Sequence, residues 1–312
     1  MTTPSQWPSE TLTGPDALWA ATDLFLAIRA DDPMAGVWEA GDVQWWWKDE
    51  PSLTASDWAF WRAPDGTVAA CLSAATNPDT SDGPGKVEAD IAWRPAYAGA
   101  VLHHVLPEAI ARLVALADGG RTLTIIVRED EPELRERLEA AGFRRDTTDD
   151  SIQTVQRPDR PPDARPLPEG FRFADDRERP AGRPHHLAKR NGARVTTLLR
   201  ETSLYRPDLD LCIRSPADDV AAYCLCWLDE ANGVGLFEPV RTEDAYQRRG
   251  LGQALLAEGI RRMMAGGATL IKVTHMAGNP AAQRLYESVG FVPAFRKLAY
   301  AHPGTASLGG TG

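Results

Sequence analysis

The chain has 312 residues, a formal net charge of −10 and a sequence pI of about 5.2. This length allows two domains, each with its own hydrophobic core. The acidic charge argues against nucleic acid as a main partner, because contacts with phosphates require a basic surface. Since no run of about eighteen apolar residues occurs, no helix is expected to span a membrane. The first residues lack the basic and apolar stretches of a secretory signal, so a cytoplasmic protein is expected.

The cysteines and histidines predict neither a disulfide framework nor a metal site. Four cysteines in a chain of this length point to a reduced protein. Cys224 and Cys226 would face one side of a strand, but no second pair of ligands lies nearby at suitable spacing. The adjacent pairs His103–His104 and His185–His186 are expected on loops or on helix surfaces.

Three consecutive tryptophans, Trp45 to Trp47, lie in an early segment of the chain. On a strand they cannot all face one core, because successive side chains alternate between the two faces. At least one is therefore expected to be exposed, or to line a cleft or an interface between domains. An aromatic wall of this kind would suit a cationic amine.

The segment from Arg157 to Gly170, RPDRPPDARPLPEG, divides the chain near its midpoint. Its proline density and its lack of apolar periodicity predict an extended linker. The expected domains are residues 1–156 and 171–301, joined by this linker at 157–170. The last residues, 302–312, are expected to form a disordered tail.

Three pairs of matching segments indicate that the two halves are copies of one fold. Each half has a turn and a strand (APDGTVAACLS and SPADDVAAYCL), followed later by a short apolar strand (TLTIIV and TLIKVT). Each then has a helix with Pro near its start and Gly after its end, EPELRERLEAAGF and NPAAQRLYESVGF. The offset is roughly 150 residues each time, as expected for a duplicated domain. The mixture of strands and helices predicts an α/β (α+β) fold with helices packed on mixed sheets.

A strand, a turn and a helix in the second half carry the strongest functional pattern. The strand is expected from Val234 to Val240. The helix that follows has one apolar face, formed by Leu251, Leu255, Leu256, Ile260, Met263 and Met264. Glycines at positions 250 and 252 would let a phosphate approach the unpaired N–H groups of the first helical turn, and two arginines before them add positive charge. A glycine at a helix start also has a simple capping explanation, so this pattern alone leaves both interpretations open.

QRRGLG, from Gln247 to Gly252, resembles the acetyl-CoA loop of the GCN5-related N-acetyltransferase (GNAT) superfamily, whose pattern is Gln/Arg-x-x-Gly-x-Gly/Ala. NPAAQRLYESVGF, from Asn279 to Phe291, is similar to that family's second signature. The order and separation of the two segments match the family, and the likeness covers residues 211–300 best. It implies a tandem, two-domain bacterial GNAT protein in which each domain is a mixed, mostly antiparallel sheet flanked by helices. The dinucleotide fingerprint Gly-x-Gly-x-x-Gly does not follow this strand.

The resemblance implies cofactor-binding roles for residues of the second half. Backbone N–H groups of the loop would hold the pyrophosphate of CoA, at Gln247, Arg248, Arg249, Gly250, Leu251 and Gly252. The strand before the loop, Glu238 to Thr242, would splay from its neighbour at a bulge. Its backbone at Val240, Arg241 and Thr242 would pair with pantetheine and polarise the thioester carbonyl. Asn279 and Ala282 would contact the cofactor at the start of the last helix, where Asn279 also suits a plain N-cap.

Two side chains are the expected catalytic groups. Tyr286 would protonate the departing CoA thiolate as general acid, and a core aromatic is the alternative. Glu238 would act as general base, with water as a relay, and a carboxylate at the sheet edge or surface is the alternative. Glu243, Asp244 and His275 are held in reserve as bases. The amine would attack acetyl-CoA directly, so the resemblance calls for no cysteine nucleophile and no metal.

The first half departs from this pattern. Its turn carries Ala98, Gly99, Ala100, Val101 and His103 in place of the arginines and paired glycines. Leu138 stands at the position of Tyr286. Glu131 stands at the position of Asn279, where a carboxylate would repel a pyrophosphate. This copy is therefore expected to be degenerate and inactive, with a structural role or as a wall of the substrate cleft.

The expected function is acetyl-CoA-dependent N-acetylation of a primary amine on a small molecule. One alternative is acetylation of protein N-termini or lysines, and another, from a different class, is a non-catalytic acyl-CoA sensor or assembly protein. The intact loop together with Tyr286 favours catalysis, since a binder needs no acid. The expected partners are acetyl-CoA and the amine, without nucleic acid or membrane, in a monomer or homodimer.

Overall fold

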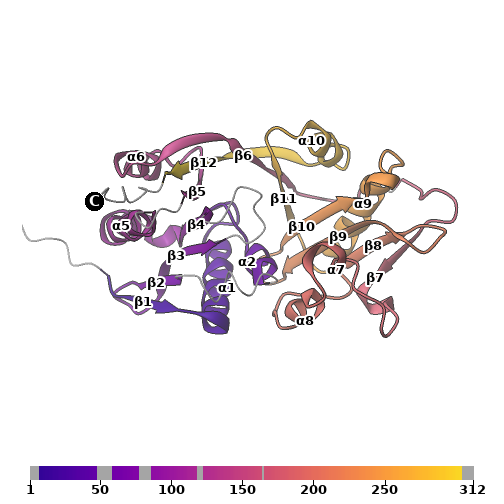
Figure 1. Ribbon diagram of the computed structural model, residues 1–312, viewed down its shortest axis with the longest axis horizontal. Coiled ribbons are helices and arrows are strands. Elements are labelled where there is room, and N and C mark those ends of the chain that lie inside the picture. Colours follow the sequence, from indigo (N-terminus) through magenta and orange to yellow (C-terminus); the bar gives the residue numbers. More distant parts are fainter. Residues whose placement is uncertain (1–6, 48–57, 77–85, 118–121, 164, 304–312) are drawn as a thin grey trace, which may run out of the picture. The chain divides into compact units, whose positions relative to one another are not determined.

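The computed structural model describes residues 7–47, 58–76, 86–117, 122–163 and 165–303 (Figure 1). The chain divides into two compact units. Unit 1 comprises Met1–Trp38, Asp49–Ser151 and Phe295–Gly312, and unit 2 comprises Glu39–Lys48 and Ile152–Ala294. Each unit therefore includes a segment from the other half of the chain. The expected domains, 1–156 and 171–301, did not include this exchange of segments. Within the expected tail, His302 ends a strand, and residues 304–312 lie outside the described residues.

Unit 1 has the strand order β1-β2-β3-β4-β5-β12. Neighbouring strands are antiparallel, except that β4 and β5 are parallel. Its strands are β1 (Ser9–Leu12), β2 (Trp58–Arg62), β3 (Val68–Thr76), β4 (Lys86–Trp93), β5 (Thr122–Arg128) and β12 (Val292–His302), and β12 begins in unit 2. Its helical segments are α1 (Gly14–Asp31), η2 (Pro95–Tyr97), α4 (Ala98–His104), α5 (Leu106–Ala117) and α6 (Pro132–Ala140).

One hydrophobic core holds unit 1 together. Val101 of α4 and Leu106 of α5 are fully buried against strand residues such as Leu123. The C-terminal strand completes this core, because Leu298 and Tyr300 belong to the same cluster. The last strand of the chain thus serves the sheet of the first half.

Unit 2 has the strand order β6-β11-β10-β9-β8-β7. Strands β7 to β10 are antiparallel neighbours, and β10 and β11 are parallel, which confirms the mixed, mostly antiparallel sheet. Its strands are β6 (Arg144–Gln156, which begins in unit 1), β7 (Arg172–Asp175), β8 (Asp210–Arg214), β9 (Val220–Asp229), β10 (Val234–Thr242) and β11 (Leu270–Met276). Its helical segments are α2 (Ala40–Trp46), η3 (Asp176–Glu178), α7 (Ala188–Asn191), α8 (Val195–Arg200), η4 (Asp244–Tyr246), α9 (Leu251–Ala265) and α10 (Pro280–Glu287).

Helices cover both faces of the sheet of unit 2. On one side, here called the α9 face, helix α9 packs across β8, β9 and β10 (Figure 1). Cys224 and Cys226 both point to this face, as expected for alternate residues of a strand. On the other side, here called the α2 face, residues of α7 and α8 and the end of α2 pack around Tyr223 and Trp227. The predicted apolar face of α9 is confirmed, because Met264 is partly buried against the core and the other five residues are buried: Leu251, Leu255, Leu256, Ile260 and Met263.

The tryptophan run lies on helix α2 and just after it, so the alternation of a strand does not apply to it. Trp45 and Trp47 are buried, and Trp46 packs partly buried against the cluster on the α2 face. Gly41 of the same helix approaches Trp227 so closely that an added Cβ would lie 2.6 Å from the Cβ atom of that tryptophan. A helix from the first half of the chain is therefore part of the core of unit 2.

No single helix in the described part of the chain is long and apolar enough to cross a membrane. The bent pair Pro95–His104 and Leu106–Ala117 passes that test when its helices, 65° apart, are taken together. Val101 and Leu113 of this pair are buried in the core of unit 1.

Candidate active site

Strand β10 carries the expected bulge. Its antiparallel pairing with β9 shifts by one residue between Phe237 and Val240, so that Glu238 and Pro239 form the bulge. The peptide bond between these two residues is cis. On the other edge, the parallel pairing of β10 with β11 runs from Val234 to Leu236 and then ends. Beyond the bulge, this edge of β10 is therefore available for hydrogen bonds to a ligand.

The turn between β10 and α9 presents backbone N–H groups at a helix start. Gly250 has φ 79 and forms the N-cap, and Arg248 before it has φ 59. The first hydrogen bond within the helix runs from Ala254 N to Gly250 O. The N–H groups of residues 250–253 therefore have no acceptor within the helix. At Gly252, an added Cβ would lie 3.2 Å from Leu285 and 3.3 Å from Thr242. This geometry favours an anion, and a side chain at position 252 would require Leu285 and Thr242 to shift by a few tenths of an ångström.

Exposed arginines surround this turn. Arg248 and Arg249 are both exposed, and the Arg249 guanidinium lies 5.6 Å from the Tyr246 ring centroid. A Cβ added at Gly250 would lie 2.9 Å from Cδ of Arg165, a linker residue that the sequence analysis did not connect with the loop. No sequence signal pointed to Arg165, because the approach depends on the path of the linker. The Gln247 side chain donates to Asp244 Oδ1 at 3.1 Å, and its backbone N–H donates to the Asp244 carbonyl at 3.4 Å, so both donors are used within the turn.

Helix α10 begins with the cap that its sequence allows. The Asn279 side chain accepts a hydrogen bond from Ala282 N at 3.1 Å, so Asn279 is an N-cap as well as a candidate cofactor contact. Leu285 packs partly buried in the α9-face cluster, and the helix therefore lies beside the start of α9. The structure thus brings the two signature segments together.

Tyr286 and Glu238 lie close enough to affect each other. Tyr286 is only 7% exposed, with its ring against His275 and Phe291. Burial, and then the negative charge of Glu238, raise the pKa of the Tyr286 hydroxyl well above its ordinary value. This hydroxyl therefore keeps its proton at neutral pH, as a general acid must. Glu238 itself is half-buried, and its backbone carbonyl accepts a hydrogen bond from Trp227 Nε1 at 2.8 Å.

The reserve bases differ in their surroundings. Glu243 pairs with Arg190 at 3.2 Å and with Arg241 at 3.5 Å. Although burial pushes the pKa of Glu243 upward, the Arg190 hydrogen bond and the charge of Arg241 hold it below its ordinary value. This carboxylate is thus a weak base that is already neutralised. Asp244 is exposed on the turn, whereas His275 is buried beside Tyr286.

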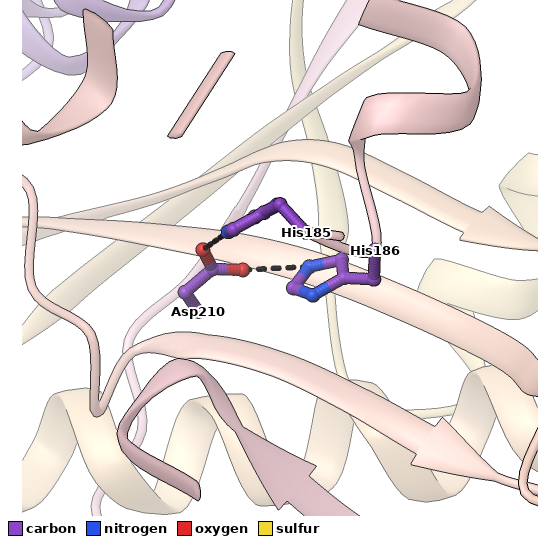
Figure 2. A group of neighbouring side chains, drawn as sticks. All are labelled: His185, His186 and Asp210. Atoms are coloured by element: carbon purple, nitrogen blue, oxygen red, sulfur yellow. Dashed lines mark hydrogen bonds and ion pairs between the residues drawn. The ribbon is translucent and has the colours of Figure 1, made fainter. Parts of the chain in front are cut away.

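A buried polar cluster on the α2 face was not anticipated. Figure 2 shows His185 and His186 on either side of Asp210, with Nε2 to carboxylate distances of 2.8 and 2.7 Å. Tyr205 also donates to Asp210, at 2.8 Å. The expectation that the His185–His186 pair lies on a surface is wrong, because both side chains are almost fully enclosed. Burial raises the pKa of Asp210, but His186 and His185 hold it well below the ordinary carboxyl range.

The hydrogen bonds of this cluster argue against a metal ion. Nδ1 of His185 accepts a hydrogen bond from Leu187 N at 3.1 Å, so the ring proton must sit on Nε2, where it faces Asp210. A histidine that binds a metal through Nε2 instead carries its proton on Nδ1 and donates a hydrogen bond from it. Without His185, only His186 and Asp210 remain, which is too few for a metal site.

A cavity of about 630 Å³ lies elsewhere in unit 2. It is lined by residues 155–163 and 288–290 together with Gln253 and Val292. None of the predicted cofactor-binding or catalytic residues lines it. The predicted residues instead gather around the bulge, the turn and α10.

Unit 2 thus contains a bulged strand, a helix start with unpaired N–H groups and a buried tyrosine. The profile of the acetyltransferase (GNAT) family matches residues 161–291. This segment belongs to that family, and the chain is an acyltransferase of the GNAT type. GNAT enzymes use acetyl-CoA as the co-substrate.

Solved structures share the two-unit fold. A tandem GNAT protein from the clavulanic acid biosynthesis pathway is 13% identical, with a TM-score of 0.64 over 97% of this chain and 100% of its own. A GCN5-related N-acetyltransferase from Sphaerobacter thermophilus is 20% identical, with a TM-score of 0.58 over 96% of each chain. A GNAT acetyltransferase from Colwellia psychrerythraea is 13% identical, with a TM-score of 0.55 over 95% of this chain and 100% of its own. No protein with curated annotation matches the chain.

Proposed function

We propose that unit 2 transfers the acetyl group of acetyl-CoA directly to a primary amine of a small molecule. One observation carries the proposal: the unpaired edge of β10 after the bulge, the start of α9 and Tyr286 all lie in the same unit. These are the parts that a pyrophosphate, a pantetheine arm and a departing thiolate each require. A protein that only binds the cofactor has no need of the third.

The loop would hold the pyrophosphate. The N–H groups at the start of α9, from Gly250 to Gly252, lie before the first hydrogen bond of the helix, where the dipole is positive. Arg248, Arg249 and Arg165 add positive charge around this turn. Backbone N–H groups would thus bind the pyrophosphate, and the charge of the arginine side chains would strengthen this binding.

The strand would hold the thioester. Val240, Arg241 and Thr242 follow the bulge on an edge that β11 does not pair. Their backbone would pair with the pantetheine arm, and an N–H group near Val240 would stabilise the oxyanion that develops on the thioester carbonyl. Asn279 and Ala282 would contact the arm from the start of α10.

The chemistry would need one base and one acid. Glu238 removes a proton from the ammonium group of the acceptor, directly or through water, so that the neutral amine attacks the thioester carbon. The C–S bond then breaks, and Tyr286 donates its proton to the CoA thiolate. The amide nitrogen loses its second proton to solvent, and no covalent enzyme intermediate forms.

Two observations support a small acceptor. The α2 face is closed by residues of α2, α7 and α8, whose side chains fill the surface opposite the α9 face. A solved protein with the same two-unit fold comes from the biosynthetic pathway of clavulanic acid, itself a small molecule. The net charge of −10 suits a cationic amine.

Calorimetric titration of acetyl-CoA into the full chain is the first test, followed by thiol release with a panel of small primary amines. Gly250→Glu places a carboxylate at the anion site and should abolish binding. Gly99→Glu is the matched control in the first copy, because a Cβ there meets no atom within 4 Å. One site per chain, lost only in Gly250→Glu, supports the proposal.

Other outcomes contradict it in different ways. Two sites per chain would show that unit 1 also binds the cofactor. Tight binding without thiol release on any amine would favour a sensor of acyl-CoA. No binding at all would overturn the proposal.

A further inference from the structure

A buried nitrogen of His275 lacks a hydrogen-bond partner among the described residues. His275 is 6% exposed, and its Nε2 atom is fully enclosed. Its Nδ1 atom lies 3.0 Å from the carbonyl oxygen of Met276. A carbonyl can only accept, so the ring proton sits on Nδ1 and Nε2 is a bare acceptor. Native proteins rarely leave such an acceptor unpaired, so this atom calls for a partner.

The position of His275 places this acceptor beside the candidate site. Parallel pairing with β10 ends at Lys272, and His275 follows three residues later on β11, where the strands no longer pair. Ile271 and Val273 belong to the α9-face cluster, so alternation turns His275 to the same face. Its ring centroid lies 5.8 Å from that of Tyr286. An arm that runs along the free edge of β10 toward Tyr286 therefore passes His275.

We propose that His275 Nε2 accepts a hydrogen bond from an amide N–H of the pantetheine arm, and so helps to position the thioester. The inference rests on the proposed function, since it assumes that the arm enters between β10 and β11. Amide N–H groups are the donors that the arm of an acyl-CoA carries near its sulfur. The neutral imidazole offers a lone pair and no second proton, which suits an amide donor and not an anion.

The first copy, which is expected to bind no cofactor, offers a comparison at the position equivalent to His275. In the matching strands TLTIIV and TLIKVT, Arg128 follows the first as His275 follows the second. Arg128 donates to both carboxylate oxygens of Asp130 at 2.7 Å, and its guanidinium lies 3.8 Å from the Phe295 ring centroid. That side chain is thus satisfied within unit 1, whereas His275 keeps an open acceptor.

Two substitutions distinguish the roles of the two ring nitrogens of His275. His275→Asn keeps a side-chain N–H that reaches the Met276 carbonyl but removes the outer acceptor. His275→Gln places an amide oxygen near the position of Nε2 and should restore part of the interaction. Calorimetry on the full chain should then compare acetyl-CoA with adenosine 3′,5′-bisphosphate, which lacks the arm.

The expected result is roughly tenfold weaker binding of acetyl-CoA to His275→Asn, with partial recovery in His275→Gln. The bisphosphate should bind all three proteins equally, and the melting temperature without ligand should not fall. Equal loss for both ligands would mean general damage, and no loss for either would mean that the acceptor serves no ligand; both overturn the proposal. A fall in kcat with unchanged affinity also overturns it, because the residue would then act on chemistry and not on binding.

Failure of the proposed function would look different. If the wild-type chain does not bind acetyl-CoA, the catalytic proposal and this one fall together. If the chain binds acetyl-CoA but acetylates no amine, only the catalytic proposal falls, and the comparison of His275→Asn with the bisphosphate still decides the role of His275.

Discussion

Strand β4 of unit 1 and strand β10 of unit 2 occupy equivalent places in two copies of one fold, and they differ in their register on the neighbouring strand. Both pair antiparallel on one edge and briefly parallel on the other. The register of β4 on β3 is continuous from Val87 to Trp93, whereas that of β10 on β9 shifts at Glu238 and Pro239. One inserted residue therefore separates an ordinary strand from one that can offer its backbone to a substrate.

The turns after these strands differ in the same sense. In unit 2, a left-handed glycine starts a long helix at the end of an arginine-rich loop. In unit 1, α4 starts at Ala98 without a positive φ, and the nearby Arg94 is bound to Asp31 at 2.6 Å. Leu138 fills the place of the tyrosine and is fully buried. Burial raises the pKa of Glu131, the counterpart of Asn279. In its described residues, the first copy keeps the packing of the fold and has neither the glycine turn nor the tyrosine of the second copy.

The largest effect is expected from Tyr286→Phe. The ring packing is kept and the acidic proton is lost, so kcat should fall by about 10² to 10⁴ while acetyl-CoA binding is unchanged. Stopped assays of thiol release and calorimetry measure the two quantities. Tyr300→Phe, which removes a buried hydroxyl in unit 1 that donates to Glu139, is the control and should leave kcat unchanged. A normal kcat in Tyr286→Phe would leave the residue as a core aromatic only.

Gly252→Val should weaken acetyl-CoA binding by about 100-fold, equivalent to about 3 kcal/mol. A branched side chain there would push against Leu285 and Thr242, and would displace the N–H groups of the loop. Gly99→Val in the first copy meets open space and should bind normally. Equal affinities for the two variants would show that the loop of unit 2 does not hold the cofactor.

Glu238→Gln should lower kcat by about 10- to 100-fold and change its pH dependence. In the wild type, burial and the Glu238 charge raise the pKa of Tyr286, so the phenol stays protonated and kcat should hold as pH rises to about 10. Removing that charge lowers the pKa of Tyr286, and the alkaline loss of kcat should move to lower pH. A pH profile of kcat for the wild type and for Glu238→Gln tests this. An unchanged alkaline limb would show that the Glu238 charge does not affect the proton of Tyr286.

The smallest effect is expected from the arginines at the turn. Arg248→Ala and Arg249→Ala should each weaken acetyl-CoA binding by a few-fold to about tenfold, because both side chains are exposed and screened by water. The loss should shrink at high salt, which titrations at two ionic strengths would show. Arg165→Ala tests whether the linker adds to the positive charge that attracts the cofactor to the turn. A salt-independent loss would point to a structural role instead.

The local parts of this molecule could be read from its sequence. The apolar face of α9, the glycine turn and the helix of Tyr286 follow from residue spacing, and the structure contains each of them. The bulge was expected from a resemblance, and its position at Glu238 agrees. Short-range rules suffice where a feature depends on neighbours in the chain.

The remaining parts depend on contacts between distant residues, which spacing does not encode. Adjacent histidines suggested a surface, but the sheet encloses His185 and His186 around Asp210. The tryptophan run gave no sign that it would pack on Trp227, which lies far along the chain. The linker likewise gave no sign that Arg165 would approach Gly250.

The exchange of segments between the units has a consequence for how the protein is made. Strand β12 pairs with β5 from Lys297 to His302, so the first sheet is incomplete until residue 302 has been synthesised. The second core, in turn, needs α2, which is synthesised before the rest of that core. A gene cut at the linker would thus yield two fragments that each lack a piece of core. Recombination that separates the halves would leave each unit without the segment that the other half supplies.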